Sequence, residues 1–299
     1  MSILPPEIAR HHSALIALYA KRTRFFVGGY PKSGTTWLQL LLNAHPEVSC
    51  IGEGHLPHHL EPLLRQALAQ HNALIAEKNA TVLAELPGFP QFTDGQVDYL
   101  VTSAIAMLLM APPKAATAHA VGERTPYVSL AFPTLAALFP NARFINIVRD
   151  GRDCAVSAWF HNQRIDPVQR ARSFASLDAE IEPHASHWST VVAECAAWCE
   201  TQPTRCMLVR YEDLVAQPDD VLRSLFGFLG VASSGDVVAG CRRAATFETL
   251  SGGRAAGQED VASLFRRGLP GDRHNHLSAA DNTLYFAIAG AVLARLGYT

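Results

Sequence analysis

The sequence predicts an α/β fold in which a central, mostly parallel sheet is flanked by helices. Three short apolar runs, residues 24–29, 142–150 and 205–213, are typical of buried strands. Each run leaves glycines or charged residues at its carboxyl end, and stretches of helical composition separate the runs. Because strands that alternate with helices form a parallel sheet covered on both faces, we expect a ligand to bind at the carboxyl ends of these strands.

The first run leads directly into GGYPKSGTTW, residues 28–37, and helical composition follows. Gly29 and Gly34 have the spacing of the phosphate-binding loop of nucleoside triphosphatases, which makes the predicted fold P-loop NTPase-like. Thr35 stands where that loop has its lysine, and Lys32 lies inside the loop instead. Backbone N–H groups of such a turn, together with the N-terminus of the next helix, bind an anion. The residues expected to hold it are Ser33, Gly34, Thr35 and Thr36.

The second run continues into VRDGRDCAVS, residues 148–157. Arg149 follows the strand, and Ser157 lies eight residues further on, about two helical turns into the next element. A cation and a hydroxyl group so placed suit a second anion, which predicts a ligand phosphorylated at two ends. Taken alone, Arg149, Arg152 and Asp153 also fit a solvated helix start with local ion pairs.

The 299 residues are expected to form a single domain, residues 1–299. Residues 56–120 are prone to form helices and are predicted to be a helical insertion, either a cap over the site or a packing element with substrate contacts at its edge. Residues 162–188 are polar, and we expect them to be an irregular, mobile surface region.

Composition limits the partners and the compartment. With 25 Lys plus Arg against 27 Asp plus Glu, the chain has no basic field for nucleic acid. Its longest apolar stretches, residues 104–111 and 284–294, are too short to span a membrane, and its first residues lack the apolar run of a secretory signal. These features predict a soluble cytoplasmic protein. No zinc-type or disulfide spacing appears, so neither a metal site nor a disulfide is expected and buried thiols are predicted for Cys50, Cys154, Cys195, Cys199, Cys206 and Cys241.

Four segments in order, YPKSGTTWL, VRDGRDCAVS, VRYEDL and FRRGLPGD, resemble the sulfotransferases that use 3′-phosphoadenosine 5′-phosphosulfate (PAPS). The resemblance covers about residues 25–278. It implies that the loop binds the 5′-phosphosulfate without a metal and that Lys32 approaches the oxygen bridging phosphate and sulfur. It also implies that Ser157 engages Lys32 before transfer. The implied contacts to the 3′-phosphate are Arg149, Ser157, Arg266, Arg267 and Gly268, and those to adenine are Trp37, Tyr211 and Phe247.

The residue that accepts the acceptor's proton is a separate question. The cytosolic branch of this family uses a histidine, which GERTPYV, residues 122–128, lacks. Arg124 takes the position of a family lysine that contacts the sulfuryl oxygens. Residues 43–55 resemble the tyrosylprotein sulfotransferases, in which a glutamate is the base, and the matching residue is Glu53. His55 is the rival base, and an extended chain would point both side chains the same way.

Two other functions remain open from the sequence: a magnesium-dependent nucleotide kinase with an unusual loop, and a nucleotide-binding module without catalysis. The resemblance leaves the acceptor open among small molecules, carbohydrates and peptides, and the oligomeric state is equally undetermined.

Overall fold

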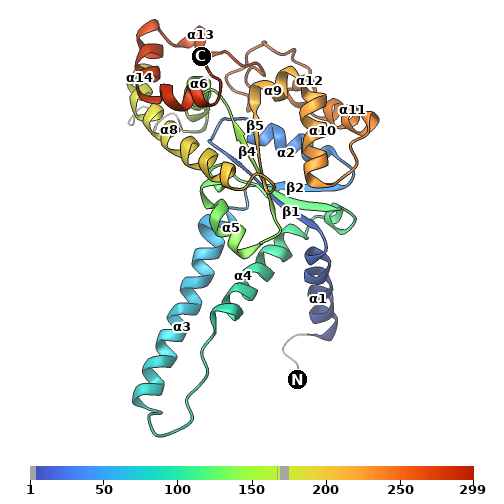
Figure 1. Ribbon diagram of the computed structural model, residues 1–299, viewed down its shortest axis with the longest axis vertical. Coiled ribbons are helices and arrows are strands. Elements are labelled where there is room, and N and C mark those ends of the chain that lie inside the picture. The colour runs from blue at the N-terminus through green and yellow to red at the C-terminus, as the bar shows by residue number, and fades with distance from the viewer. Residues whose placement is uncertain (1–4, 167, 169–174) are drawn as a thin grey trace.

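The computed structural model describes residues 5–166, 168 and 175–299 of the chain (Figure 1). The described residues form a five-stranded sheet with the strand order β2-β3-β1-β4-β5, and every neighbouring pair is parallel. This confirms the predicted fold class. The strands are β1 (Thr23–Gly29), β2 (Val48–Gly52), β3 (Ala120–Arg124), β4 (Arg143–Val148) and β5 (Cys206–Arg210).

Strands β2 and β3 were not predicted. The sequence of β3, AVGER, contains a glycine and two charged residues, yet all five of its residues are buried. An apolar run is the usual sign of a central parallel strand, so β3 has no such sign. Its charged residues become important at the site described below.

Helices cover both faces of the sheet because the side chains of the strands alternate between them. Phe25 and Val27 pack with one layer, while Phe26 packs with the other. The first layer contains α2 (Thr35–Ala44), α9 (Tyr211–Ala216), α10 (Pro218–Leu229) and α11 (Gly235–Ala244). The second contains α1 (Pro6–Ala20), α4 (Asp94–Leu109), α5 (Phe132–Leu138) and α8 (Leu177–Thr201). Helices α6 (Gly151–Ile165) and α14 (Ala279–Arg295) pack against α8. The shorter helical elements are η1 (Leu56–Leu60), η2 (Pro113–Ala116), η3 (Val128–Ala131), α12 (Phe247–Leu250) and α13 (Arg273–His276).

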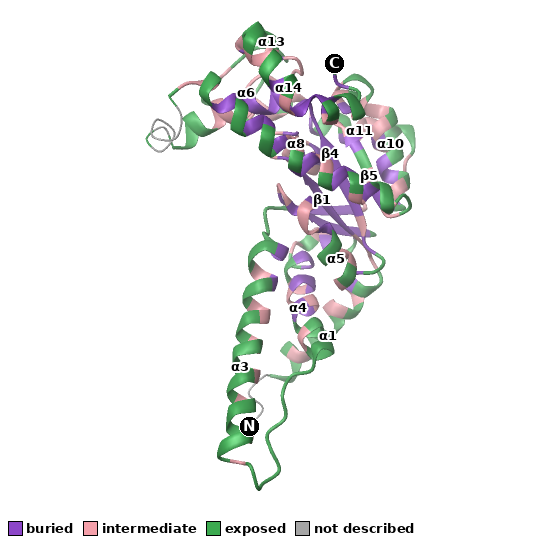
Figure 2. Ribbon diagram, turned by 60° about the vertical axis from the view of Figure 1, so that its left-hand side comes forward, coloured by how far each residue is buried: buried purple, intermediate pink, exposed green. Residues whose placement is uncertain are grey.

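The predicted insertion, residues 56–120, is helical. Helix α3 (Glu61–Thr81) and α4 form a long hairpin that projects from the sheet, away from α6 and α14 (Figures 1 and 2). Val101, Ile105 and Leu109 anchor α4 in the core, whereas α3 is exposed along most of its length (Figure 2). The base of the hairpin therefore packs against the sheet, and its far end extends away from the carboxyl ends of the strands.

The prediction that residues 162–188 form an irregular surface region was wrong. Residues 162–188 are mostly helical, because α6 continues to Ile165 and α8 begins at Leu177; residues 167 and 169–174 of that range lie outside the described residues. Ile181 and Trp188 bury one side of α8, a pattern obscured by polar residues and an internal proline.

Cys199 and Cys206 form a disulfide, with a distance of 5.0 Å between their Cα atoms. The prediction of six free thiols missed it because the chain reverses between the end of α8 and the start of β5, a turn that spacing alone does not reveal. The other four cysteines are buried thiols, as predicted. Within the described part of the chain, no helix combines the length and the apolar character that crossing a membrane requires.

Candidate functional site

The loop between β1 and α2 lies at the carboxyl end of the central strand. Its backbone is unusual, because Lys32 and Gly34 both have positive φ angles, of 71° and 96°. A Cβ atom on residue 34 would lie 2.5 Å from the ring of Tyr211, so the loop needs glycine there. Thr35 begins α2 directly after this turn, which places the N-terminal amides of the helix beside the loop.

The loop opens into a cavity of about 700 Å³. The structure brings nearly all of the predicted site residues to its wall. From the loop and the first turn of α2 come Lys32, Gly34, Thr35, Thr36 and Trp37; from more distant segments come Glu53, His55, Arg124, Arg149, Ser157, Tyr211, Phe247, Arg266, Arg267 and Gly268. These segments are spread over more than two hundred residues of the chain, and the fold brings them together at one cavity.

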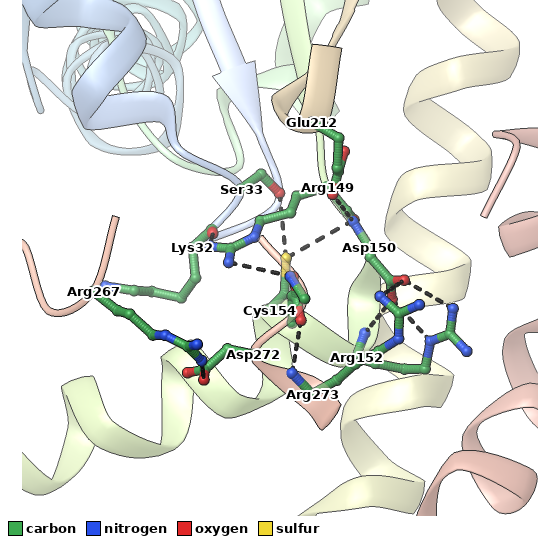
Figure 3. A network of polar contacts seen from close by, with 12 residues as sticks. Lys32, Ser33, Arg149, Asp150, Arg152, Cys154, Glu212, Arg267, Asp272 and Arg273 are labelled. Carbon is green, nitrogen blue, oxygen red and sulfur yellow. Dashed lines mark hydrogen bonds and ion pairs between the residues drawn. The ribbon is translucent and has the colours of Figure 1, made fainter. Parts of the chain in front are cut away.

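Ser33 is the exception. Its side chain is fully buried, and its hydroxyl group lies 3.6 Å from the Sγ atom of Cys154 (Figure 3). Its backbone N–H donates to the carbonyl of Tyr30 at 3.1 Å, which closes the turn. The prediction that Ser33 holds the anion is therefore not supported by this geometry, because both of its polar groups are used within the fold.

Arg149 connects the loop to α6 (Figure 3). Its guanidinium donates to the carbonyl of Lys32 at 3.3 Å, lies 3.5 Å from a carboxylate oxygen of Asp153, and stands 4.4 Å from the centre of the Tyr211 ring. Its Nε atom is buried without a partner among the described residues. Arg149 is thus a buried cation at the cavity wall, where its charge can attract an anion.

The segment with the two adjacent arginines is held by two acidic residues that sequence reasoning did not assign to the site. Asp272 forms ion pairs with both Arg266 and Arg267. Asp153, which is fully buried, accepts hydrogen bonds from the backbone amides of Gly271 at 2.6 Å and Arg273 at 2.9 Å. Asp153 stands four residues after Arg149 in the DGRD segment, so the charges there are buried pairs and not a solvated helix start.

Arg254 is a third residue that sequence reasoning missed. Its guanidinium donates to the carbonyls of Phe265 and of Arg266, and it stands 5.3 Å from the centre of the Phe247 ring. It therefore ties the loop before the arginine pair to the aromatic wall of the cavity. An arginine in a glycine-rich stretch gives no sequence signal for this role.

Lys32 lines the cavity close to both cationic and anionic side chains. Burial lowers its pKa to about 8, helped by the neighbouring cations Arg164 and Arg149 and opposed by the carboxylate of Glu53. Burial and the charge of Lys32 also lower the pKa of His161 to about 4, so that ring is neutral at physiological pH. A lysine whose pKa is lowered in this way gains charge when an anion binds beside it.

Glu53 and His55 follow β2 in a turn and not in an extended segment. Both have left-handed backbone conformations, with φ angles of 57° and 47°, so the chain is not extended here. Both side chains nevertheless line the cavity. Glu53 forms an ion pair with Arg124, and Arg124 also donates to the amide oxygen of Gln39 at 3.2 Å. The cavity therefore places a carboxylate and a guanidinium together near Lys32.

Asp150 stands where a nucleotide kinase with this loop would need a metal-binding carboxylate. It is buried, and its oxygens accept from Arg152 at 2.8 Å and Arg273 at 2.9 Å (Figure 3). Two guanidinium groups thus occupy this carboxylate. Across the described ranges, no group of three acidic, histidine or cysteine side chains is arranged to bind a metal ion.

Comparison with known proteins finds similarity to one protein family and to several of its named members. The model of a family described as the sulfotransferase family matches residues 24–234. The chain is 27% identical over 210 residues to a putative protein-tyrosine sulfotransferase of Caenorhabditis briggsae, covering 70% of this chain and 66% of the relative. It is 28% identical over 216 residues to protein-tyrosine sulfotransferase 2 of Gallus gallus, covering 71% of this chain and 52% of the relative. The chain thus spans between about half and two thirds of these relatives.

Solved structures share the fold at low identity. A mouse sulfotransferase complexed with PAP (adenosine 3′,5′-bisphosphate) superposes with a TM-score of 0.58 at 18% identity, covering 94% of this chain and 88% of the other. A retinol dehydratase in complex with androsterone and PAP gives a TM-score of 0.52 at 17% identity, covering 95% of this chain and 85% of the other.

Proposed function

Because this chain belongs to the sulfotransferase family, we propose that it transfers a sulfuryl group from PAPS to an acceptor hydroxyl group. One observation carries the proposal: a single cavity is lined by the β1–α2 loop with Lys32, by Arg149 and the adjacent arginines Arg266 and Arg267, and by Glu53 and Arg124. Such a cavity has room for a doubly phosphorylated donor and for an acceptor beside it.

The cavity wall suits the donor in three respects. The loop amides and the N-terminus of α2 offer donors for the 5′-phosphosulfate. Arg149 and Arg267, which both line the cavity, offer charge for the 3′-phosphate. Trp37 and Phe247 offer aromatic faces for the adenine ring. PAPS supplies the activated sulfur when it is bound, and the protein supplies binding, orientation and electrostatics.

The catalytic roles follow from the charges around Lys32. A bond forms between the acceptor oxygen and sulfur as the bond between sulfur and the bridging oxygen breaks, and the acceptor's proton passes to the carboxylate of Glu53. Lys32 stabilises the negative charge that develops on the departing phosphate. Arg124 orients Glu53 through their ion pair and contributes positive charge near the sulfuryl oxygens. His55 is the second candidate for the base.

A peptide tyrosine is the acceptor that the named relatives favour, because the two described above carry the name protein-tyrosine sulfotransferase. The chain covers only part of those relatives, so this acceptor class belongs to the proposal.

The donor site is tested by thermal unfolding with adenosine 3′,5′-bisphosphate, with ADP, and with ATP plus magnesium. A ligand at about 100 times its dissociation constant adds about 2.7 kcal/mol of stability. We expect stabilisation by the 3′,5′-bisphosphate alone. Arg267→Ala should remove this stabilisation. Arg242 is an exposed arginine on α11 that forms an ion pair with Asp219, so Arg242→Ala should retain the stabilisation. Stabilisation by ATP and magnesium instead would favour a nucleotide kinase.

Catalysis is tested by transfer of labelled sulfate from PAPS to a panel of tyrosine peptides, phenols and sugars. Glu53→Gln should reduce turnover by about 10²-fold or more, as expected when a general base is lost, while the affinity for the bisphosphate is retained. His55→Gln should have a small effect if Glu53 is the base, and the reverse order would assign the base to His55. Binding of the bisphosphate without turnover on any acceptor would favour the noncatalytic module.

A further inference from the structure

Three consecutive backbone amides of the turn after β2 are bonded to three consecutive residues at the end of β3. The N–H of Glu53 donates to the carbonyl of Arg124 at 2.7 Å. The N–H of Gly54 donates to the Oε2 atom of Glu123 at 3.3 Å, and the N–H of His55 donates to the hydroxyl oxygen of Thr125 at 3.3 Å. The side chains of Glu123 and Thr125 thus extend the backbone pairing of β2 and β3 beyond the last residue of the sheet.

The turn requires such support because of its conformation. Glu53 and His55 are in the left-handed region, which is uncommon for residues other than glycine and costs about 1–3 kcal/mol where the surroundings impose it. A conformation of this kind persists only when its hydrogen bonds and packing hold it. The turn places both side chains at the cavity wall, so its backbone decides where a proton acceptor stands.

Glu123 is an unusual residue for this position. Its side chain is fully buried, and burial raises the pKa of its carboxyl group. Its Oε2 atom also accepts from the hydroxyl group of Thr125 at 2.7 Å, while its Oε1 atom has no partner among the residues that the structure describes. A half-satisfied buried carboxyl group is costly compared with an apolar side chain of similar size. Packing alone would therefore favour leucine or methionine here.

We propose that Glu123 and Thr125 are positioning residues that hold the turn carrying Glu53 against the acceptor side of the cavity, an inference that rests on the proposed role of Glu53 as the base. Glu123 binds the amide of Gly54 directly. Thr125 relays the same carboxylate to the amide of His55 through its hydroxyl group, which donates to Glu123 and accepts from His55. Neither side chain is among those that line the cavity, so both act through the turn.

The first test measures the turn without any catalysis. Amide hydrogen exchange is followed at Gly54 and His55 by mass spectrometry at single-residue resolution, with Thr125→Val compared with Thr125→Ser. Valine matches threonine in shape and lacks the hydroxyl group, whereas serine retains it. We expect exchange at His55 to be at least about tenfold faster in the valine variant and near the wild-type rate in the serine variant. The backbone amide of Phe144, which donates to the carbonyl of Arg205 at 2.7 Å, reports global stability, and its exchange rate should be unchanged.

Glu123 is tested in the same way with Glu123→Leu and Glu123→Gln. Glutamine retains an acceptor oxygen for the amide of Gly54, so it should keep most of the protection that leucine removes. Unchanged exchange at Gly54 in the leucine variant, with Phe144 protected as in the wild type, would overturn the proposal.

The second test connects the turn to catalysis, with the tyrosine peptide or other acceptor that gives turnover. We expect Thr125→Val to lower kcat by at least about tenfold with the KM for PAPS unchanged. In the Glu53→Gln background the same substitution should have little further effect, because a residue that acts only through Glu53 cannot be lost twice. Additive losses would overturn the positioning role. An absence of turnover in the wild-type protein would count against the proposed function, and the exchange experiment would still decide about the turn.

Discussion

Gly268 lies beneath the aromatic wall of the proposed adenine site, and replacing it with alanine is a sharp test of that site. Its φ angle is 76°, and a Cβ atom there would lie 2.2 Å from a ring carbon of Phe247. Ordinary contacts begin at 3.4 Å, so the ring must retreat by about 1.2 Å. Both residues line the cavity, so the displacement changes the surface on which the base would stack.

Two effects of the substitution have to be separated. A left-handed alanine costs roughly 1–2 kcal/mol of folding free energy whatever its neighbours are. Stacking of a base on an aromatic side chain contributes about 1–3 kcal/mol, so loss of the ring position should weaken binding of adenosine 3′,5′-bisphosphate by about 5- to 150-fold. Gly271→Ala is the matched control, because its φ angle is 83° and its nearest neighbour, a carbon of His274, is 3.7 Å from the added atom.

The assay is isothermal calorimetry of the bisphosphate with the wild-type protein and both variants, together with chemical denaturation of each. We expect both variants to lose folding free energy, Gly268→Ala more because the Phe247 ring must also move, and we expect a loss of affinity in Gly268→Ala alone. Dissociation constants that agree within about twofold between the variants would refute the reasoning that Phe247 stacks on the base.

Two more predictions concern charges at the site. A phosphate bound beside Lys32 should raise its pKa from the value of about 8 in the free protein, so the bisphosphate should bind with proton uptake and lose affinity above pH 8, by at most about tenfold per pH unit. Calorimetry in buffers of different ionisation enthalpy measures the proton uptake, which Lys32→Met should abolish. An affinity that does not change with pH would contradict this prediction. Asp153→Ala should lower the free energy of unfolding by about 3 kcal/mol, because it leaves two part-buried backbone amides without their acceptor and the buried Arg149 without its carboxylate partner. Urea denaturation measures this loss, Asp153→Asn should retain part of the stability, and a change below about 1 kcal/mol would show that other groups or water satisfy these donors.

The sequence by itself determined the fold class and identified most of the residues that line the proposed donor site. A phosphate-binding turn needs its glycines and its cation within one short stretch, so Lys32 and Gly34 were recognisable from their spacing. The same holds for Arg149 and Ser157, which lie at one strand end and in the helix after it, whereas the adjacent arginines were identified from the resemblance to the family. Three of the five strands were apolar runs and were recognised in the same way.

Tertiary structure alone decided the features that depend on partners far away in the chain. Strand β3 escaped prediction because Glu123 and Arg124 interrupt its apolar character, and their burial makes sense only beside the turn after β2. The Cys199–Cys206 disulfide depends likewise on a chain reversal. The free energy of a buried charge is set by the donors and acceptors around it, which are supplied by segments distant in sequence. A local pattern therefore indicates which residues can carry chemistry, and only the assembled fold determines how they are held.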